Sequence, residues 1–388
     1  MNSKKLNIAI LGSTGSIGKQ ALSVIKANTD IFSVEILTAG SNADLLIQQA
    51  KDFKPQAVVI ADESKYNYIS ESLANEDIFV YAGKSALKDI VSFSNIDIIL
   101  SGIVGIAGLE VAIETAKTGK RFAIANKEAI VVAGEILMQT AKQFNTEIIP
   151  VDSEHSAVFQ CLTGEELNAV KTLYLTASGG PFLNKNIDTN NISIEDALKH
   201  PNWQMGKKIS IDSATLMNKS FEIIEAHHLF NLKKEQIEVV IHPESVIHSL
   251  VKFIDGSVKA QMSVNDMRMQ IKYAFTYPYR LNAETEDFDI LKHNNLHFFE
   301  PDKSHKKALD LAYYAIEKSG NIPAIINAAD EFLVDMFLHN KLKFNSILDE
   351  IIDITNKIDY IKNPQLDDII ATDKEVKIRL KEKYKKQI

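Results

Sequence analysis

A glycine-rich segment near the start of the chain is the feature that most restricts its fold. The apolar run Leu6–Leu11 ends directly at Gly12–Gly18 (GSTGSIG), and a helical pattern that includes Ile17 and Leu22 follows. In such a strand–turn–helix unit, glycines let the backbone approach a pyrophosphate, which binds at the N-terminus of the helix. The spacing G-x-x-G-x-x-G is a variant of the usual fingerprint, and a plain tight turn is the alternative. The segment therefore predicts a dinucleotide site.

Alternating strand and helix patterns continue to residue 151 and predict a doubly wound, Rossmann-like α/β fold with a parallel sheet. Gly40, Ser41 and Asn42 follow the second expected strand, where an NAD site usually has an acid for the ribose 2′-hydroxyl. No acid stands there, and Ser41 and Asn42 offer hydrogen bonds to a 2′-phosphate, which favours NADP. The strands expected after the first are Val34–Leu37, Ala57–Ile60, Ile78–Tyr81, Ile96–Leu100, Phe122–Ala125 and Glu147–Val151.

Two acids stand at the end of the last of these strands. If Pro150–Glu154 is extended, Asp152 and Glu154 point to the same side, since strand side chains alternate. Two carboxylates held so close repel each other unless a cation lies between them, and oxygen-only ligands suit Mg²⁺ or Mn²⁺ better than zinc. A solvated loop start is the alternative. Lys127 follows the preceding strand at the edge where such sheets bind ligands, so it is a further candidate.

The middle of the chain holds a second set of candidate site residues. Ser178 begins a turn with two glycines, which offers a hydroxyl and open backbone amides to an anion, although an ordinary turn is equally compatible. Trp203 is the only tryptophan and stands between a proline and Gly206, which suggests a mobile flap. We therefore expect a ligand-binding surface in this region.

A helix is expected over Ala214–Phe230, with Asp212 or Ser213 as its N-cap. On it, Asn218, Lys219 and Glu222 share one face through i,i+3 and i,i+4 spacing. A solvated charged face is the usual meaning of such a set, but the flanking residues are apolar, so Glu222 is expected beside buried surface. Glu222 could complete a divalent-metal site with Asp152 and Glu154, and Ser213, Asn218 and Lys219 would suit a phosphate.

Charge, cysteine content and hydropathy exclude several classes of protein. The net charge of −8 argues against a nucleic-acid-binding face, and 388 residues suggest two or three domains. The single cysteine, Cys161, excludes an internal disulfide and fits a reducing compartment; we expect it to be a small core residue. The uncharged run Ile98–Leu109 is shorter than the roughly 20 residues of a membrane-spanning helix. With no signal-peptide pattern, a cytoplasmic protein is expected.

The last part of the chain predicts a hairpin and then helices only. Val239–Val251 alternates as one strand, and Asp255-Gly256 turns it into a second strand, Ser257–Val264, which could form a sheet edge and pair across a two-fold axis. The Lys-rich end, Lys381–Lys386, is expected to be a solvated helix face. The helical patterns that predict a small bundle cover Ala308–Lys318, Ala324–Leu338, Phe344–Ile358 and Asp367–Lys385.

Taken together, these motifs resemble the 1-deoxy-D-xylulose 5-phosphate reductoisomerases, the NADPH-dependent enzymes of the non-mevalonate isoprenoid pathway. Their order along the chain also fits that family, and the resemblance covers most of the first 280 residues. The matching segments are Leu11–Gly18 (LGSTGSIG), Ala125–Glu128 (ANKE), Pro150–Ser156 (PVDSEHS), Thr176–Phe182 (TASGGPF), His200–Glu222 (HPNWQMGKKISIDSATLMNKSFE) and His242–Val251 (HPESVIHSLV).

The resemblance implies a role for each candidate residue. Asp152, Glu154 and Glu222 would hold Mg²⁺ or Mn²⁺, and Lys127 and Ser153 would contact the sugar backbone of the substrate. The phosphate of the substrate would be bound by Ser178, Ser213, Asn218 and Lys219, with His200 nearby, and Trp203 and Met205 would lie on the flap that closes over it. The residues implied at the NADPH site are Thr14, Gly15, Ser16, Ile17, Gly40, Ser41, Asn42, Asn126, Glu128 and Gly206.

The family's reaction couples a skeletal rearrangement to a hydride reduction and yields 2-C-methyl-D-erythritol 4-phosphate. By resemblance, residues 1–151 form the NADPH-binding domain, 152–283 the catalytic and dimerisation domain, 284–305 a linker and 306–388 a C-terminal helical domain, and the protein is a homodimer. This chain departs from the family pattern at Ser41, where some members carry a basic residue, and at Glu244, where the pattern usually shows Gln.

Two other functions are compatible with parts of the pattern. Another NADP-dependent oxidoreductase, such as a semialdehyde dehydrogenase, would need Cys161 as a nucleophile, so Cys161→Ala would abolish its activity. A catalytically idle NADP-sensing module would bind the cofactor whether or not Asp152, Glu154 and Glu222 were present.

Overall fold

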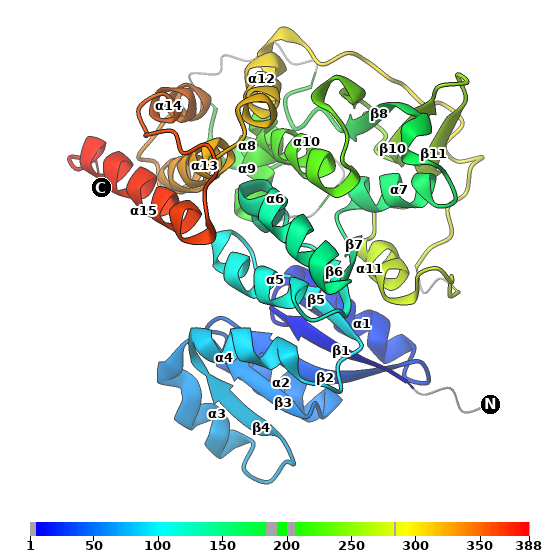
Figure 1. Cartoon of the computed structure of the whole chain (residues 1–388), viewed down its shortest axis with the longest axis vertical. Coiled ribbons are helices and arrows are strands. Elements are labelled where there is room, and N and C mark those ends of the chain that lie inside the picture. Colours follow the sequence, from blue (N-terminus) through cyan, green and yellow to red (C-terminus); the bar gives the residue numbers. More distant parts are fainter. Residues whose placement is uncertain (1–4, 184–191, 200–202, 204–205, 283–284, 388) are drawn as a thin grey trace. The chain divides into compact units, whose positions relative to one another are not determined.

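The structure, a computed structural model, describes residues 5–183, 192–199, 203, 206–282 and 285–387 (Figure 1). It comprises two compact units, each described by itself below. The first unit contains Met1–Ala129, Leu137–Ser156 and Asp266–Asp287, and the second contains Ile130–Ile136, Ala157–Asn265 and Phe288–Ile388. The domain boundaries expected after residues 151, 283 and 305 stay predictions.

The first unit is built on a seven-stranded sheet whose strands are all parallel, which confirms the predicted fold class. The strand order β4-β3-β2-β1-β5-β6-β7 reverses direction between β1 and β5, where doubly wound folds bind their ligands. All residues of β3 and β5 are buried, as expected for strands covered on both faces. The strands are β1 (Leu6–Leu11), β2 (Phe32–Ala39), β3 (Ala57–Ile60), β4 (Phe79–Ala82), β5 (Ile98–Ser101), β6 (Arg121–Ile124) and β7 (Glu147–Pro150).

A helix from the middle of the sequence completes the first unit. In α11, Phe275 packs edge-on against Phe32 of β2 with ring centroids 5.7 Å apart, and its carbonyl accepts a hydrogen bond from Arg121 Nη1 at 2.9 Å. No pattern in the sequence predicted this return of the chain. The helices that carry residues of this unit are α1 (Ser16–Ala27), α2 (Ala43–Phe53), α3 (Tyr66–Ser72), α4 (Gly83–Asp89), α5 (Leu109–Ala116), α6 (Lys127–Phe144) and α11 (Met267–Thr276).

The second unit contains a four-stranded mixed sheet in the order β11-β10-β8-β9. The expected single strand over Val239–Val251 is wrong, because β9 ends at Ile241 and pairs with β8, and β10 starts only at Ile247. The hairpin of β10 and β11 is confirmed. The strands are β8 (Val170–Ala177), β9 (Ile237–Ile241), β10 (Ile247–Phe253) and β11 (Val258–Met262).

The break between β9 and β10 is stabilised by side chains of the HPES motif. His242 Nδ1 donates to the carbonyl of His297 at 2.9 Å, and its Nε2 accepts from the amide of Ile247 at 3.2 Å. Glu244 accepts from the His297 ring at 2.6 Å and from the His297 amide at 3.2 Å. Partial burial raises the pKa of Glu244, but these hydrogen bonds outweigh it and lower the pKa overall. Glu244 therefore links the segment around His297 to the loop between β9 and β10.

The second unit also contains helices, and the predicted C-terminal bundle is confirmed: α13 packs against both α14 and α15, and α12 packs against α10. Among the described helices, none is both long and apolar enough to cross a membrane. The helices are α7 (Ser153–Leu162, which begins in the first unit), α8 (Ile194–Ala197), α9 (Lys207–Thr215), α10 (Met217–Phe230), α12 (Lys303–Lys318), α13 (Ile322–Leu338), α14 (Ser346–Thr355) and α15 (Leu366–Lys383).

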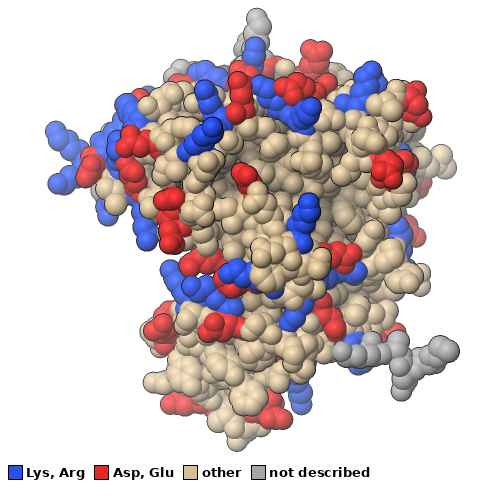
Figure 2. All heavy atoms as spheres, in the orientation of Figure 1, with Lys and Arg blue, Asp and Glu red and all other residues tan. Residues whose placement is uncertain are grey.

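Basic and acidic side chains are interspersed on the surface of the C-terminal bundle. Figure 2 shows lysines and arginines beside acids on one face of the molecule. In the bundle, Lys383 of α15 pairs with Glu350 and, at 3.0 Å, with Asp353 of α14. Within Lys381–Lys386, every residue except Tyr384 is exposed. The structure therefore agrees with the expectation of a solvated helix face.

Candidate functional site

The glycine-rich turn has the backbone geometry that its sequence predicts. Gly12 has φ +86°, and a Cβ there would lie 3.0 Å from the carbonyl oxygen of Gly102, which follows β5. At Gly18 a Cβ would lie 2.4 Å from the Cα of Ser13, so α1 packs directly on the turn. A side chain at Gly12 would push the turn away from the segment after β5, and one at Gly18 would push α1 away from the turn. The turn therefore lies where the strand order reverses, and it leads into α1 with Gly15 and Ser16 exposed.

A buried hydrogen-bond pair holds this turn in place, and sequence reasoning missed it. The hydroxyl of Ser13 donates to Gln49 Oε1 at 2.7 Å, and Gln49 Nε2 donates back to the carbonyl of Ser13 at 3.0 Å. Ser13 is fully buried and Gln49, on α2, is 5% exposed. Gln49 stands among Leu46, Ile47 and Ala50 on the buried face of α2. A polar residue in that apolar pattern could have indicated from the sequence that Gln49 has a buried hydrogen-bond partner.

The residues expected near the ribose lie at the carboxyl end of β2. Gly40, Ser41 and Asn42 are exposed, next to the glycine-rich turn because β1 and β2 are neighbours in the sheet. Asn42 caps α2, with its Oδ1 accepting from the amide of Leu45 at 3.2 Å. This leaves the Asn42 side-chain amide and the Ser41 hydroxyl as possible donors to a ligand.

Asn126 has a structural role that its sequence position did not reveal. Its Oδ1 caps α6 by accepting from the amide of Ala129 at 2.7 Å, and its Nδ2 donates to the carbonyls of Ile103 and, at 3.0 Å, of Gly105. It is 2% exposed and so ties the loop after β5 to the start of α6. A direct contact of Asn126 with a cofactor stays a prediction. Glu128 lies in the first turn of α6 and is 8% exposed.

The acids of the PVDSEHS motif lie at a strand-to-helix junction. Asp152 follows β7, and α7 begins at Ser153, so the expectation that Asp152 and Glu154 share one face of a strand is wrong. Asp152 Oδ2 is 2.7 Å from Lys127 Nζ, and the Ser153 hydroxyl donates to Glu154 at 2.5 Å. The fold thus brings Lys127 to the acidic pair, as its place at the neighbouring strand end indicated.

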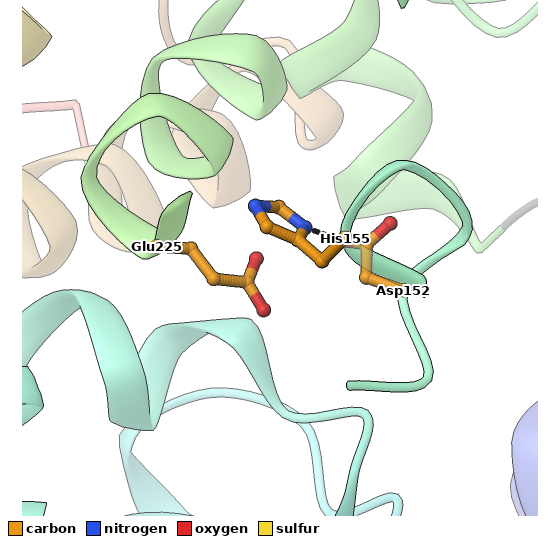
Figure 3. Close-up of side chains that lie close together, drawn as sticks. All are labelled: Asp152, His155 and Glu225. Carbon is orange, nitrogen blue, oxygen red and sulfur yellow. Dashed lines mark ion pairs between the residues drawn. The ribbon is translucent and has the colours of Figure 1, made fainter. Parts of the chain in front are cut away.

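A histidine that the sequence analysis did not single out lies beside Asp152. His155 is fully buried, and its Nδ1 is 3.9 Å from Asp152 Oδ2; this contact, which Figure 3 marks with a dashed line, is an ion pair when the ring is protonated. Figure 3 also draws Glu225 of α10, a buried residue that is 1% exposed. Glu225 stands three residues after Glu222 and therefore on the same helix face, and this spacing could have identified it as a candidate from the sequence.

In the second unit, the serine–glycine turn and α9 lie together. Gly179 and Gly180 have positive φ angles of +84° and +69°, and the amide of Gly180 donates to the hydroxyl of Ser178 at 3.1 Å. A Cβ at Gly180 would lie 3.1 Å from the carbonyl oxygen of Ser213. The glycine therefore lets the turn pack against α9, and it brings Ser178 and Ser213 into one region.

The helix expected over Ala214–Phe230 is two helices. Asp212 and Ser213 lie inside α9, so neither is an N-cap, and α10 begins at Met217. The break is at Leu216, which has a left-handed conformation with φ +64°. Thr215 Oγ1 accepts from the amide of Met217 at 3.3 Å and so stabilises the new helix start. Asn218 and Lys219 thereby come to lie in the first turn of α10, where backbone amides and the helix dipole favour an anion.

Glu222 is joined to both of these residues. Asn218 Nδ2 donates to Glu222 Oε1, and Lys219 Nζ donates to Glu222 Oε2. Lys219 is 4% exposed and Glu222 is 1% exposed. This agrees with the expected shared face and with the burial of Glu222. The ammonium of Lys219 and the amide of Asn218 favour the ionised form of this carboxylate, which is the form that binds metals.

Part of the expected flap lies within the described residues. Trp203 is partly buried, and its ring centroid is 6.3 Å from that of His248 on β10. Gly206 is exposed and precedes α9 as its N-cap. The predicted site residues His200 and Met205 lie outside the described residues.

Sequence comparison identifies three matching family models that together cover most of the chain. They are 1-deoxy-D-xylulose 5-phosphate reductoisomerase over residues 8–134, the C-terminal domain of 1-deoxy-D-xylulose 5-phosphate reductoisomerase over residues 148–230, and the DXP reductoisomerase C-terminal domain over residues 262–379.

Individual relatives cover nearly the whole chain. The 1-deoxy-D-xylulose 5-phosphate reductoisomerase of Bacteroides fragilis is 49% identical over 96% of this chain and 97% of its own length. The enzyme of Caldanaerobacter subterraneus subsp. tengcongensis is 49% identical over 97% of this chain and 99% of its own.

Solved structures give the same result. The Zymomonas mobilis 1-deoxy-D-xylulose 5-phosphate reductoisomerase in complex with NADPH matches with TM-score 0.92 and 37% identity, over 98% of this chain and 99% of that one. A DOX-P reductoisomerase in complex with NADPH, fosmidomycin and magnesium matches with TM-score 0.92 and 37% identity, over 98% of both chains.

Proposed function

This chain belongs to the 1-deoxy-D-xylulose 5-phosphate reductoisomerase family, and on that premise we propose that it converts 1-deoxy-D-xylulose 5-phosphate to 2-C-methyl-D-erythritol 4-phosphate. The cofactors are NADPH and a divalent cation, Mg²⁺ or Mn²⁺, in keeping with the NADPH and magnesium complexes of its structural relatives. The observation that carries the proposal is that reductoisomerases 49% identical to this chain align with 96–97% of its length.

NADPH is proposed to bind at the carboxyl edge of the parallel sheet. The glycine-rich turn, with Thr14, Gly15, Ser16 and Ile17, would receive the pyrophosphate, and the segment after β2 would face the 2′-phosphate. Support comes from the exposed start of α1, from the position of the turn where the strand order reverses, and from the exposed Ser41. Asn126, Glu128 and Gly206 complete the proposed cofactor residues.

Replacing Gln49 by Leu is expected to raise the KM for NADPH several-fold and to leave the KM for the sugar phosphate unchanged. Leu fills the same volume but leaves the hydroxyl and carbonyl of buried Ser13 without Gln49, at a cost of about 1–3 kcal/mol. Steady-state kinetics with each substrate varied would measure the effect. Gln48→Leu, at the exposed neighbouring position on α2, is the matched control. A variant with an unchanged KM for NADPH would show that the pair does not hold the turn for the cofactor.

The metal ligands are proposed to be Asp152, Glu154 and Glu222, each offering one carboxylate oxygen. Three carboxylates and no sulfur or ring nitrogen is a donor set that fits Mg²⁺ or Mn²⁺. When bound, the cation would supply positive charge that polarises the substrate ketone and favours the rearrangement. Lys127 pairs with Asp152 and Lys219 pairs with Glu222, and a neighbouring ammonium favours the charged carboxylate that a cation needs.

The remaining side chains are proposed to orient the sugar phosphate. Lys127 and Ser153 would hold its backbone, and Ser178, Ser213, Asn218 and Lys219 would bind its phosphate, with His200 nearby. The packing of the Ser178 turn on Ser213 and the position of Asn218 and Lys219 at the start of α10 support the phosphate assignment. Trp203 and Met205 would cover the bound sugar and exclude water while the reactive aldehyde is reduced.

Trp203→Ala is expected to raise the KM for the sugar phosphate about tenfold or more, because the indole would no longer cover the substrate. The melting temperature should change little, since Trp203 is only partly buried. Kinetics and thermal unfolding of the same preparation would test both expectations. A large drop in melting temperature would instead assign Trp203 to the core.

The two alternative functions differ from this proposal in testable ways. Burial raises the pKa of Cys161 to about 11, so its thiol is protonated at neutral pH and poorly suited to act as the nucleophile of a semialdehyde dehydrogenase. An NADP-sensing module would show no turnover. NADPH oxidation with 1-deoxy-D-xylulose 5-phosphate, with and without Mn²⁺, distinguishes all three: the proposal predicts oxidation that needs both the sugar phosphate and the metal.

We further propose that the enzyme is a cytoplasmic homodimer. Among the strands that the structure describes, β11 is at one edge of the four-stranded sheet, and its first three residues, Val258–Ala260, are exposed, which fits pairing with a second copy. The one cysteine, Cys161, is buried and not part of a disulfide, which fits a reducing compartment.

A further inference from the structure

A lysine of α9 joins three helices of the second unit at one point. Lys208 Nζ is 2.6 Å from Asp212 Oδ2, one turn further along α9, and 2.6 Å from Asp330 Oδ2 in the middle of α13. The same ammonium lies 4.9 Å from the ring centroid of Phe221 on α10. We call Lys208, Asp212 and Asp330 the α9–α13 clamp. The sequence motifs gave no role to Lys208 or Asp330, and the N-cap role expected for Asp212 is wrong because it lies inside α9.

The carboxylates of the clamp are deeply buried. Asp330 is fully buried, Asp212 is 2% exposed, and the Lys208 side chain is 25% exposed. Taking such charges out of water is costly, and well-packed apolar residues would join two helices at least as stably. Unlike apolar contacts, an ion pair depends on the orientation of its groups, so an ammonium between two carboxylates fixes how one helix is rotated against another. We therefore expect the rotation of α9 about its axis to matter for the function of the second unit.

The rotation of α9 sets the direction of Ser213, the proposed phosphate ligand that directly follows Asp212. Successive helix residues point about 100° apart, so fixing Asp212 toward α13 also fixes the direction of Ser213. Ser213 is partly exposed, and its carbonyl lies against Gly180 of the serine–glycine turn. The break at Leu216 comes next, and it places Asn218 and Lys219 in the first turn of α10. A rotation of α9 would displace all of these groups together.

We propose that Asp330 is a positioning residue for the substrate's phosphate: through Lys208 and Asp212 it fixes α9, so that the Ser213 hydroxyl and the amides of the Ser178–Gly180 turn converge on the phosphate. This role rests on the proposed function of that site. It gives the C-terminal bundle, to which α13 belongs, a task in substrate recognition although Asp330 itself does not touch the substrate.

The test compares Asp330→Asn with the wild-type enzyme. The variant keeps the size of the side chain and removes its charge. It is expected to raise the KM for 1-deoxy-D-xylulose 5-phosphate about tenfold or more, because small displacements of positioned groups are costly, and to leave the KM for NADPH unchanged. The inhibition constant of inorganic phosphate, measured against the sugar phosphate, should rise by a similar factor.

Two further variants separate positioning from general stabilisation. Glu331→Gln is the matched control, since Glu331 is the next residue of α13 but pairs at 2.8 Å with Lys377 of α15; its KM values should stay at those of the wild type. Lys208→Arg should retain most of the phosphate affinity because a guanidinium can bridge both carboxylates, whereas Lys208→Gln should behave like Asp330→Asn.

An Asp330→Asn enzyme with unchanged KM for the sugar phosphate, or with equal increases for both substrates, would overturn the proposal. If that variant does not fold, Lys208→Gln decides by the same two criteria. Failure of the proposed function gives a different result: the wild type itself would then not oxidise NADPH with the sugar phosphate. In that case calorimetric titration of wild type and Lys208→Gln with inorganic phosphate still tests the clamp, and equal affinities would contradict it.

Discussion

Glu222→Gln is expected to abolish metal-dependent turnover while NADPH binding stays intact. The amide keeps the volume of the side chain and can still bind Asn218, but it removes one of three negative charges proposed to hold the cation. Because Glu222 is 1% exposed, water cannot readily replace the lost ligand. Loss of one electrostatic ligand at a reacting group costs roughly 10²–10³-fold in rate, and we expect at least that.

NADPH oxidation with saturating sugar phosphate and Mg²⁺ measures this loss, and quenching of tryptophan fluorescence by NADPH measures cofactor binding. Glu317→Gln is the control, since Glu317 is an exposed glutamate whose side chain pairs with Lys234 on the surface. Unchanged turnover of Glu222→Gln in saturating Mg²⁺ would refute the metal assignment.

Lys219→Met should have the second largest effect, on both stability and substrate binding. Lys219 is 4% exposed and its ammonium binds the buried carboxylate of Glu222. Removing one partner of a buried ion pair typically costs about 3–5 kcal/mol, because the other charge stays buried. The same change removes a proposed phosphate ligand, so the KM for the sugar phosphate should rise by about 100-fold or more.

Urea unfolding and steady-state kinetics would measure the two effects separately. Lys117→Met is the matched control: Lys117 also pairs with a glutamate three residues away, Glu114, at 2.8 Å, but the two side chains are 44% and 38% exposed, so the change in stability should be about 1 kcal/mol or less. A Lys219→Met enzyme with stability close to that of the control would contradict a tight buried pair. Normal KM for the sugar phosphate in a folded variant would remove Lys219 from the phosphate site.

The parallel sheet was predictable because its signal is local. Each strand is a short apolar run at a regular distance from the next, and the glycines of the first turn are required by its own backbone, as the positive φ of Gly12 shows. The sequence could not reveal where helices break. Leu216 adopts a left-handed conformation although leucine rarely does, so its own residue type gives no sign of the break.

Candidate site residues were predictable where the chemistry is concentrated in a short motif, and missed where partners are far apart in the chain. The position of Lys127 at a strand end indicated its place beside Asp152, which the structure confirms at 2.7 Å. Gln49 stands on an otherwise apolar face of α2, and Asp330 lies with Asn327 on the buried face of α13; nothing in either segment indicates Ser13 or Lys208 as a partner. The return of α11 to the first unit was missed for the same reason.

The central claim is that Asp152, Glu154 and Glu222, from separate parts of the chain, bind one divalent ion. Electron paramagnetic resonance of Mn²⁺ titrated into the NADPH-bound enzyme tests it most directly, since free Mn²⁺ is counted without any turnover. One bound Mn²⁺ per chain is predicted, with affinity lowered about 10–100-fold or more in each of Asp152→Asn, Glu154→Gln and Glu222→Gln. Wild-type Mn²⁺ affinity in any one of these variants would contradict a shared ion.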